Sequence, residues 1–271
     1  MLNSNFFFVI TGATSGLGKS LALKFSKIPN SKLILIGRSK KKINNLKKNI
    51  YFNNKNISFF ICDFSEHYQI VKLLKKLSKI KKIDYLINNA GGFYLKKTYN
   101  KIGVEKNFYL NYLSIFYFTL NLLKKSFVKK IINITSRSHR NFLINTGDLQ
   151  AINKFSFWKS YKNAKFLLIL FTYYLSTKFK KTIIFCIDPG RIRSDFGAND
   201  NVFIKFIFKL YLLVVGKSVD FVSEKLVKII LKNNKTGLYF QNFKCSKSHL
   251  KTYNFNLQKK VWGLSMDYFK N

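Results

Sequence analysis

Short apolar runs alternate with longer lysine-rich segments along the whole chain, and this alternation limits the folds available to it. Seven runs are predicted strands, over residues 6–10, 32–36, 57–62, 83–88, 130–135, 182–187 and 237–240. Helices are predicted over residues 16–27, 40–49, 68–80, 104–126, 157–178 and 219–231. Strands that are hydrophobic almost throughout and are separated by helices indicate a parallel sheet with both faces covered. We therefore expect an α/β fold with a doubly wound parallel sheet, whose ligands bind beyond the carboxyl ends of the strands.

The 271 residues contain no internal repeat and no linker rich in Gly, Ser or Pro, so we expect a single domain over 1–271. The apolar stretch at 202–215, VFIKFIFKLYLLVV, is too short and too charged for a transmembrane helix, because it holds Lys205 and Lys209. It lies in a segment, at about 195–218, that we expect to be a substrate lid or an interfacial element. Three interpretations stay open: a buried or oligomer-interface helix, a helix at a membrane surface, or an apolar lid over a substrate.

The net charge of +38 would favour anionic partners such as nucleic acid or membrane surfaces. However, only five of the 49 basic residues are arginine, and the lysines are spread along the chain together with abundant Asn, Ile, Phe and Tyr. This pattern is typical of A/T-rich coding, so we expect no nucleic-acid partner.

The three cysteines, at positions 62, 186 and 245, are far apart and have no metal-ligand spacing. We therefore expect neither disulfides nor a bound metal. A reducing compartment fits this usage, and the N-terminal apolar run leads directly into a glycine turn rather than a secretory cleavage site. An intracellular protein is predicted, either cytoplasmic or peripheral to an internal membrane.

A glycine-rich turn, TGATSGLGKS at 11–20, follows the first predicted strand. Gly12 permits a tight turn, Gly16 lets the backbone approach a pyrophosphate, and Gly18 allows close packing of helix and strand. The N-terminus of the following helix offers unpaired N–H groups to a phosphate. Taken alone, the turn is weak evidence for a dinucleotide site, and a simple strand-to-helix connection is the favoured interpretation.

The other predicted strands also end in polar or glycine residues. These are Arg38 after the second strand, Asp63 after the third, Asn89 and Gly91 after the fourth, Ser136 after the fifth, and Pro189 and Gly190 after the sixth. Because the carboxyl ends of parallel strands meet at one edge of a sheet, we expect these residues to line one site.

Tyr161 and Lys165 are four residues apart and share one face of a predicted helix. A free tyrosine has a pKa of about 10, too high for efficient proton transfer near neutrality. A nearby ammonium group would favour the phenolate and lower that pKa. In isolation, the spacing favours an ordinary solvated pair on a helix surface. His67 and His139 have no partners at ligand spacing, and we interpret them as surface or turn residues.

Taken together, the motifs resemble those of the short-chain dehydrogenase/reductase family. They are TGATSGLG at 11–18, CDF at 62–64, NNAG at 88–91, Asn111 in LNYLS, ITS at 134–136, YKNAK at 161–165 and DPGRIRS at 188–194. A wide gap between Ser136 and Tyr161, the run SRSHR, and the ending TGLYFQNFK before a helix with Trp262 are similar to the retinol-dehydrogenase-like branch. The resemblance implies a Rossmann fold. Tyr112 and Ser114 depart from this branch, which usually has His and Gly there.

The resemblance implies a catalytic set of four residues. Tyr161 would be the acid/base, Lys165 would lower its pKa and bind the nicotinamide ribose, Ser136 would orient the carbonyl, and Asn111 would hold a helix and a water link behind Lys165. The implied cofactor contacts are Gly12, Ser15, Gly16, Leu17 and Gly18 at the pyrophosphate, Arg38 and Asp63 at the adenosine, Asn89 and Gly91 at its ribose side, and Tyr161, Lys165, Pro189, Gly190 and Ser194 at the nicotinamide.

The end of the second strand favours NADP(H) over NAD(H). An NAD site usually has an acidic residue there for the ribose 2′-hydroxyl, whereas this segment reads LIGRSKKK. Arg38 can instead form charge-assisted hydrogen bonds to a 2′-phosphate.

The predicted function is an NADP(H)-dependent oxidoreductase that interconverts a hydrophobic alcohol and its aldehyde or ketone by hydride transfer. Two alternatives stay open: another reductase of the family, similar to protochlorophyllide reductases, or a non-catalytic NADP-binding sensor or scaffold. The expected partner is a hydrophobic small molecule, with peripheral membrane contact and homo-oligomerisation left open.

Overall fold

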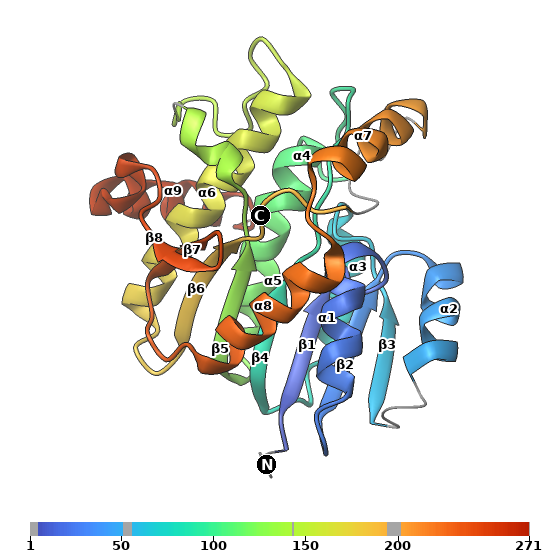
Figure 1. Ribbon diagram of the computed structural model, residues 1–271. Coiled ribbons are helices and arrows are strands. Elements are labelled where there is room, and N and C mark those ends of the chain that lie inside the picture. Colours follow the sequence, from blue (N-terminus) through green and yellow to red (C-terminus); the bar gives the residue numbers. More distant parts are fainter. Residues whose placement is uncertain (1–4, 51–55, 143, 194–201, 271) are drawn as a thin grey trace.

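The computed structural model describes residues 5–50, 56–142, 144–193 and 202–270. Their strands form one eight-stranded sheet in the order β3-β2-β1-β4-β5-β6-β7-β8 (Figure 1). The first seven strands are parallel, and only β8 runs antiparallel to its neighbour β7. The strand bounds are β1 Phe7–Thr11, β2 Lys32–Gly37, β3 Ile57–Ile61, β4 Lys82–Asn88, β5 Phe127–Ile134, β6 Ile183–Asp188, β7 Leu238–Gln241 and β8 Lys244–Ser246. The predicted doubly wound α/β fold is confirmed.

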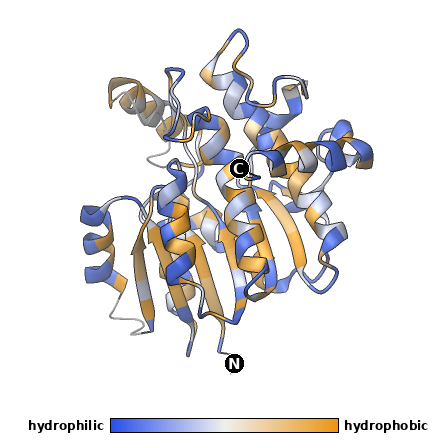
Figure 2. Ribbon diagram, turned by 180° about the vertical axis from the view of Figure 1, so that it is seen from behind, coloured by the Kyte–Doolittle hydropathy of each residue, from blue (hydrophilic) through white to orange (hydrophobic). Residues whose placement is uncertain are grey.

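Helices cover both faces of this sheet (Figures 1 and 2). One face packs against α1 (Gly16–Ser26), α2 (Lys40–Ile50) and α8 (Val219–Lys232). The other packs against α3 (His67–Lys76), α4 (Lys106–Phe108), α5 (Ser114–Leu123), α6 (Phe157–Lys178) and α9 (Phe255–Asp267). Alternate residues of β1 serve the two cores, since Phe8 and Ile10 belong to the first and Val9 to the second.

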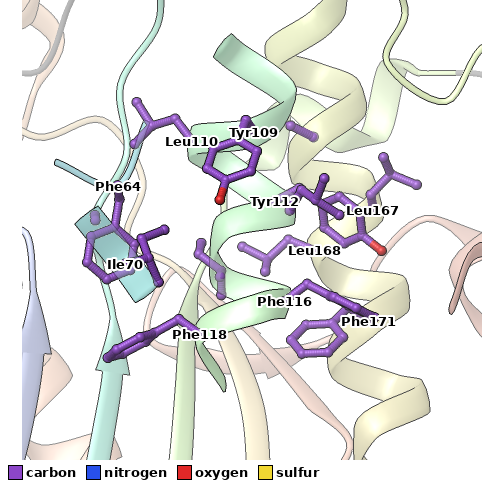
Figure 3. Close-up of a cluster of buried hydrophobic side chains, with 14 of the residues drawn as sticks. Phe64, Ile70, Tyr109, Leu110, Tyr112, Phe116, Phe118, Leu167, Leu168 and Phe171 are labelled. Atoms are coloured by element: carbon purple, nitrogen blue, oxygen red, sulfur yellow. The ribbon is translucent and has the colours of Figure 1, made fainter. Parts of the chain in front are cut away.

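The second core is densely aromatic, because α5 and α6 both direct large side chains into it (Figure 3). Phe116 contacts Phe171 with 5.1 Å between ring centroids, and Trp262 of α9 packs against both. Aromatic side chains of this size bury large apolar areas. This core therefore fixes α6 against the sheet, which matters because α6 carries Tyr161 and Lys165.

Two features of the fold differ from the sequence prediction. The helix expected over 104–126 is broken into α4, a π turn at Tyr109–Leu113, and α5. Single π turns inside helices are rare and often occur at functional sites. The short strand β8 was not predicted, because its three residues are too few to show an alternating pattern.

A buried lysine joins β5 to the end of α8. Lys130 is 2% exposed, and its ammonium group donates to the carbonyl oxygens of Ile230, Leu231 and Asn233 at 3.3, 3.0 and 2.6 Å. Ile230 and Leu231 lie in the last turn of α8 and Asn233 is its C-cap. Carbonyl groups at this end of a helix lack helical partners and carry the negative end of the helix dipole. Burial lowers the pKa of Lys130.

The apolar stretch at 202–215 forms helix α7, Val202–Val215. Most of its described side chains are exposed, with Phe203 at 69% and Val214 at 82%, whereas Leu212 is buried. Within the described ranges, no helix is both long and apolar enough to cross a membrane. The lid or interfacial role of the segment at about 195–218 stays a prediction, and its residues 195–201 lie outside the described part.

Candidate active site

A cavity of about 1180 Å³ lies at the carboxyl edge of the sheet, where the predicted site was expected. It is lined by these sequence-predicted residues: Gly12, Ser15, Gly16, Leu17, Gly18, Arg38, Asp63, Asn89, Gly91, Ser136, Tyr161, Lys165, Pro189 and Gly190. Asn111 lies just behind the wall rather than in it. Ser194 falls outside the described residues. The sheet topology thus brings residues from six strand ends into one space.

The glycine turn has the shape of a phosphate cradle. Gly12 and Gly16 adopt φ values of 65° and 49°, a region that residues with a Cβ rarely occupy. A Cβ on Gly12 would lie 2.9 Å from the Ala90 Cα, and one on Gly18 would overlap the Gly12 carbonyl. Ser15 is the N-cap of α1 but forms no capping bond with its side chain, and the first residues of α1, Gly16 to Gly18, border the cavity. The residues present therefore fit a bound phosphate.

The side chain of Asn89 holds this turn in place. Its amide group donates to the carbonyl oxygens of Thr11 and Gly12 at 3.0 and 3.1 Å. The sequence prediction assigned Asn89 to the ribose side of a cofactor, whereas in the structure its amide is bonded to the loop itself. Asn89 still borders the cavity.

The far end of the cavity is cationic. Arg38 follows β2 directly and borders the cavity together with Lys42 of α2, which the sequence analysis did not single out. Asp63, after β3, accepts hydrogen bonds from the Ser65 N–H and hydroxyl at 2.9 and 2.8 Å. Its carboxylate is thus partly used to close its own turn.

Ser136, Tyr161 and Lys165 meet at the middle of the cavity. Ser136 follows β5, and its side chain is hydrogen-bonded to the Tyr161 hydroxyl on α6. The ammonium group of Lys165 lies 5.8 Å from the centre of the Tyr161 ring and donates to the Ile134 carbonyl oxygen at 3.1 Å. Three of the four predicted residues are therefore in one contact group.

Asn111, the fourth residue, lies in the π turn and fixes the loop beside Lys165. Its amide donates to the carbonyl oxygens of Gly92 and Asn107 at 2.8 and 2.9 Å, and its Oδ1 accepts from the Gly92 N–H at 3.2 Å. A Cβ on Gly91 would lie 3.0 Å from Asn111 Oδ1 and 3.6 Å from Lys165 Nζ. A glycine at this position therefore allows Asn111 and Lys165 to approach the same loop.

Burial dominates the electrostatics of this group. Tyr161 and Lys165 are 5% and 4% exposed. Burial raises the pKa of Tyr161, and the Asp188 charge adds to this while the hydrogen bond from Ser136 opposes it. Burial also lowers the pKa of Lys165 to about 8. The expectation that Lys165 lowers the pKa of Tyr161 therefore does not describe this structure, in which desolvation disfavours both charged forms.

Aromatic residues surround the Tyr161 ring. Trp158, three residues earlier on α6, stacks on it with 5.5 Å between centroids and 14° between planes. The Phe93 and Tyr161 rings form an edge-to-face contact, with 6.4 Å between their centroids. Phe157 of α6 and Ile204 of α7 pack against Phe93 and Tyr161. Helical spacing alone could have indicated Trp158, because residues three apart lie on the same face.

The two histidines are more deeply placed than the sequence suggested. His139 is fully buried; its Nδ1 is 2.7 Å from the Ser136 carbonyl oxygen, and its Nε2 accepts from the His249 N–H at 3.2 Å. His67 is half-buried and is hydrogen-bonded to the Tyr109 hydroxyl at 2.8 Å. The prediction of a surface position was wrong for both, because Tyr109 and His249, which bury them, are distant in sequence. His139 does lie in a turn, the 3₁₀ turn Arg137–Asn141.

A doubly wound sheet whose glycine turn opens a helix at the carboxyl edge defines a nucleotide-binding α/β protein. The comparison with protein families makes this specific: the family model described as short chain dehydrogenase matches residues 7–203. The chain belongs to the short-chain dehydrogenase/reductase family and is an oxidoreductase of that family. Members of the family use a nicotinamide cofactor.

Curated relatives include human polyprenol dehydrogenase, 27% identical over 279 residues that cover 96% of this chain and 83% of that protein. Mouse retinol dehydrogenase 12 is 28% identical over 199 residues, covering 70% of this chain and 63% of its own length. The predicted resemblance to the retinol-dehydrogenase-like branch is therefore confirmed.

Solved structures share the fold at low identity. An uncharacterised protein from Mycobacterium paratuberculosis superposes with a TM-score of 0.79 at 19% identity, covering 98% of this chain and 93% of its own. A short chain dehydrogenase from Shigella flexneri, complexed with NADP, has a TM-score of 0.65 at 18% identity, covering 88% and 96%.

Proposed function

We propose that this protein is an NADP(H)-dependent oxidoreductase that interconverts a hydrophobic alcohol and its aldehyde or ketone. The observation that carries the proposal is the hydrogen-bonded pair of Ser136 and Tyr161 beside Lys165, in the same cavity as the glycine turn. The cofactor, when bound, supplies or accepts the hydride. The chain has to hold it, orient the substrate and move one proton.

Tyr161 is the proposed proton donor for carbonyl reduction. Its raised pKa means that the phenol holds its proton at neutral pH, as a donor must. Ser136 is placed to donate a second hydrogen bond to the same carbonyl oxygen, because its hydroxyl lies next to that of Tyr161. Both groups would then stabilise the negative charge that develops on that oxygen.

Lys165 is proposed to bind the nicotinamide ribose, with Asn111 holding the loop that faces it. The bond from Lys165 to the Ile134 carbonyl fixes its ammonium group at the wall of the cavity. Ser15, Gly16 and Leu17 would bind the pyrophosphate at the N-terminus of α1. Pro189 and Gly190 would border the nicotinamide, and Ser194 is proposed to bind its carboxamide from the sequence resemblance alone.

A preference for NADP(H) is supported by the charges at the other end of the cavity. Arg38 and Lys42 both border it there, and the residues that follow β2 are Arg38, Ser39 and Lys40, with no carboxylate among them. A guanidinium group can form paired, charge-assisted hydrogen bonds to a 2′-phosphate. Asp63 is proposed to contact the adenine.

A hydrophobic substrate is supported by the apolar surroundings of Tyr161. Phe93, Trp158 and Ile204 flank its ring, and Tyr211 and Leu212 of α7 border the cavity. Helix α7 also exposes apolar side chains, so contact with a membrane or with a second copy is proposed for this helix. A location inside the cell stays a prediction.

The test is oxidation of NADPH, followed by its absorbance, with a panel of apolar aldehydes. The proposal predicts turnover that is lost in Tyr161→Phe. A non-catalytic sensor would bind NADPH without turnover, and its NADPH affinity would be equal in both proteins.

A further inference from the structure

Two arginines that follow Ser136 border the cavity on the side away from the glycine turn. Arg137 and Arg140 lie in the short 3₁₀ turn Arg137–Asn141 after β5. The chain has only five arginines among its 49 basic residues, and all five border one of two neighbouring cavities. In a sequence so rich in lysine, this distribution indicates sites that use the planar, forked donors of arginine.

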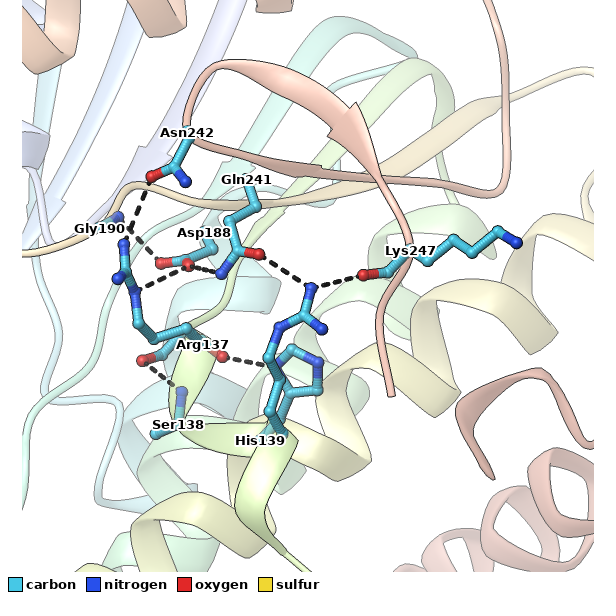
Figure 4. Close-up of polar contacts among 10 residues, drawn as sticks. Arg137, Ser138, His139, Asp188, Gly190, Gln241, Asn242 and Lys247 are labelled. Carbon is cyan, nitrogen blue, oxygen red and sulfur yellow. Dashed lines mark hydrogen bonds and ion pairs between the residues drawn. The ribbon is translucent and has the colours of Figure 1, made fainter. Parts of the chain in front are cut away.

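Neutral oxygen atoms accept hydrogen bonds from both guanidinium groups, and Arg137 also forms an ion pair with the Asp188 carboxylate (Figure 4). Arg140 donates from Nη2 to Gln241 Oε1 at 2.8 Å and to the Lys247 carbonyl at 2.6 Å. Arg137 donates from Nη2 to Asn242 Oδ1 at 3.4 Å. Amide and carbonyl oxygens orient a guanidinium group without cancelling its charge. Among the described residues, no carboxylate forms an ion pair with Arg140.

The local charge is strongly positive. Asp188 is the carboxylate of this part of the cavity wall and is 2% exposed. It lies 3.6 Å from Arg137 Nε and also accepts from Gln241 Nε2 at 3.0 Å and the Gly190 N–H at 2.9 Å. Lys162 and Arg191 also border the cavity. The basic side chains in the described cavity lining therefore outnumber its carboxylates, Asp63 and Asp188.

The turn that presents the two amides is conformationally unusual. Asn242 and Phe243, between β7 and β8, have φ values of 50° and 64°. A two-residue hairpin of this type usually has Gly at one of these positions, and a positive φ is rare for a bulky residue. Phe243 is held by the Phe221 ring at 5.7 Å and by Lys217 Nζ at 5.0 Å from its centroid. This packing keeps Gln241 and Asn242 directed at the arginines.

The position of the pair separates it from the cofactor phosphates. Arg137 and Arg140 follow β5, which lies two strands from β1 and its glycine turn in the order β1-β4-β5. At about 4.8 Å between strands this is about 10 Å. Their amide partners Asn242 and Gln241 lie at the end of β7, two strands farther from β1, so both guanidinium groups are directed away from the glycine turn. We therefore assign an anion bound by the arginines to the substrate.

We propose that Arg137 and Arg140 bind an anionic group of the substrate, a carboxylate or a phosphate, while its apolar part lies along Trp158 and Leu212. The inference rests on the proposed function and narrows its substrate class to amphiphilic aldehydes, ketones or alcohols with an oxyanion at one end. Arg137 and Arg140 are binding residues and take no part in proton transfer.

The test compares three aldehydes of similar shape: 4-carboxybenzaldehyde, 4-formylphenyl phosphate and the neutral 4-methylbenzaldehyde. The inference predicts that kcat/KM for at least one acidic aldehyde exceeds that of the neutral one by about tenfold or more, and that salt reduces this preference. Arg140→Met should lower kcat/KM for the acidic substrate by about 10- to 100-fold and leave the neutral one within about twofold. The two acidic aldehydes distinguish carboxylate from phosphate.

Two variants serve as controls. Arg140→Lys keeps a charge without the fork and should give an intermediate value. Lys244→Met removes a charge from β8, on the same hairpin but outside the cavity wall, and should change neither substrate. Equal losses for acidic and neutral aldehydes in Arg140→Met, or no preference for an acidic aldehyde in the native protein, would overturn the inference.

A binding measurement keeps the inference separate from the proposed function. Benzoate and phenyl phosphate are titrated calorimetrically into the protein saturated with NADP⁺. Tighter binding of either anion to the native protein than to Arg140→Met supports the arginine site, whether or not an aldehyde is reduced. Absence of aldehyde reduction would count only against the proposed reaction. Equal or absent binding of both anions to the two proteins contradicts the arginine site.

Discussion

The Tyr161 hydroxyl is hydrogen-bonded to the side chain of Ser136, although the two residues come from different elements of the fold. Ser136 follows β5, whereas Tyr161 lies in the second turn of α6. Between them, the chain forms the 3₁₀ turn that carries Arg137 and Arg140. One segment therefore supplies both the proposed proton-transfer pair and the proposed anion-binding pair.

Removing this hydrogen bond should shift the pH dependence of alcohol oxidation. The bond lowers the pKa of Tyr161 and so opposes the rise caused by burial. Oxidation needs the phenolate, so its rate rises as pH passes the pKa of Tyr161. Ser136→Ala should move this rise to higher pH, in addition to slowing the reaction. Ser138→Ala, a neighbouring serine of the same turn, should leave the profile in place; an unshifted profile in Ser136→Ala would contradict the assignment.

Replacing Arg38 with Asp should reverse the cofactor preference. The new carboxylate would repel a 2′-phosphate and accept a bond from a 2′-hydroxyl. We expect the KM for NADPH to rise by about 10- to 100-fold, because charge-assisted bonds to the phosphate are lost. Lys41→Asp makes the same change of charge on α2 without bordering the cavity, and it should have little effect. An unchanged KM for NADPH in Arg38→Asp would refute the role of Arg38.

Lys165 should reduce the stability of the protein at neutral pH. Its pKa is about 8 in the folded state, below the 10.5 of a solvated lysine. The folded state therefore binds its proton less readily than the unfolded state, and stability falls as the pH decreases from about 10.5 to 8. Lys165→Met removes this penalty. The difference in unfolding free energy between Lys165→Met and the native protein should therefore be about 2 kcal/mol more favourable to the variant at pH 7 than at pH 10. Urea unfolding at both pH values measures this; a difference independent of pH would exclude the shifted pKa.

Lys130 should contribute to stability without affecting the reaction. Lys130→Met removes three bonds to carbonyls at the end of α8 and leaves them buried. Unfolding free energy should fall by about 2 kcal/mol, with kcat/KM unchanged. The adjacent Lys129 is exposed, so Lys129→Met should be nearly neutral. Equal stability of the two variants would show that the buried bonds contribute little.

Much of the fold and site follows from short-range sequence patterns. Apolar strands and glycine or polar residues at their ends predicted the parallel sheet and its edge, since these signals depend on residues close in sequence. The positions of Arg38, Ser136, Tyr161 and Lys165 on one cavity follow from that topology.

The features that were not predicted depend on contacts between distant residues. His139 is bonded to His249, and Lys130 to the end of α8, so neither burial is visible in the local pattern. Gln241 and Asn242 reach the cavity only because a three-residue strand folds back on β7. The pKa of Tyr161 likewise depends on its burial, which the spacing of Tyr161 and Lys165 does not reveal.

The most direct test of the central claim is NADPH oxidation with an apolar aldehyde by native protein and Tyr161→Phe. Tyr174→Phe, which removes a hydroxyl from the same helix outside the cavity wall, is the matched control. The account predicts that Tyr161→Phe binds NADPH normally but loses about 10²- to 10⁴-fold in kcat, while Tyr174→Phe stays close to native. Equal turnover by the native protein and Tyr161→Phe would contradict it.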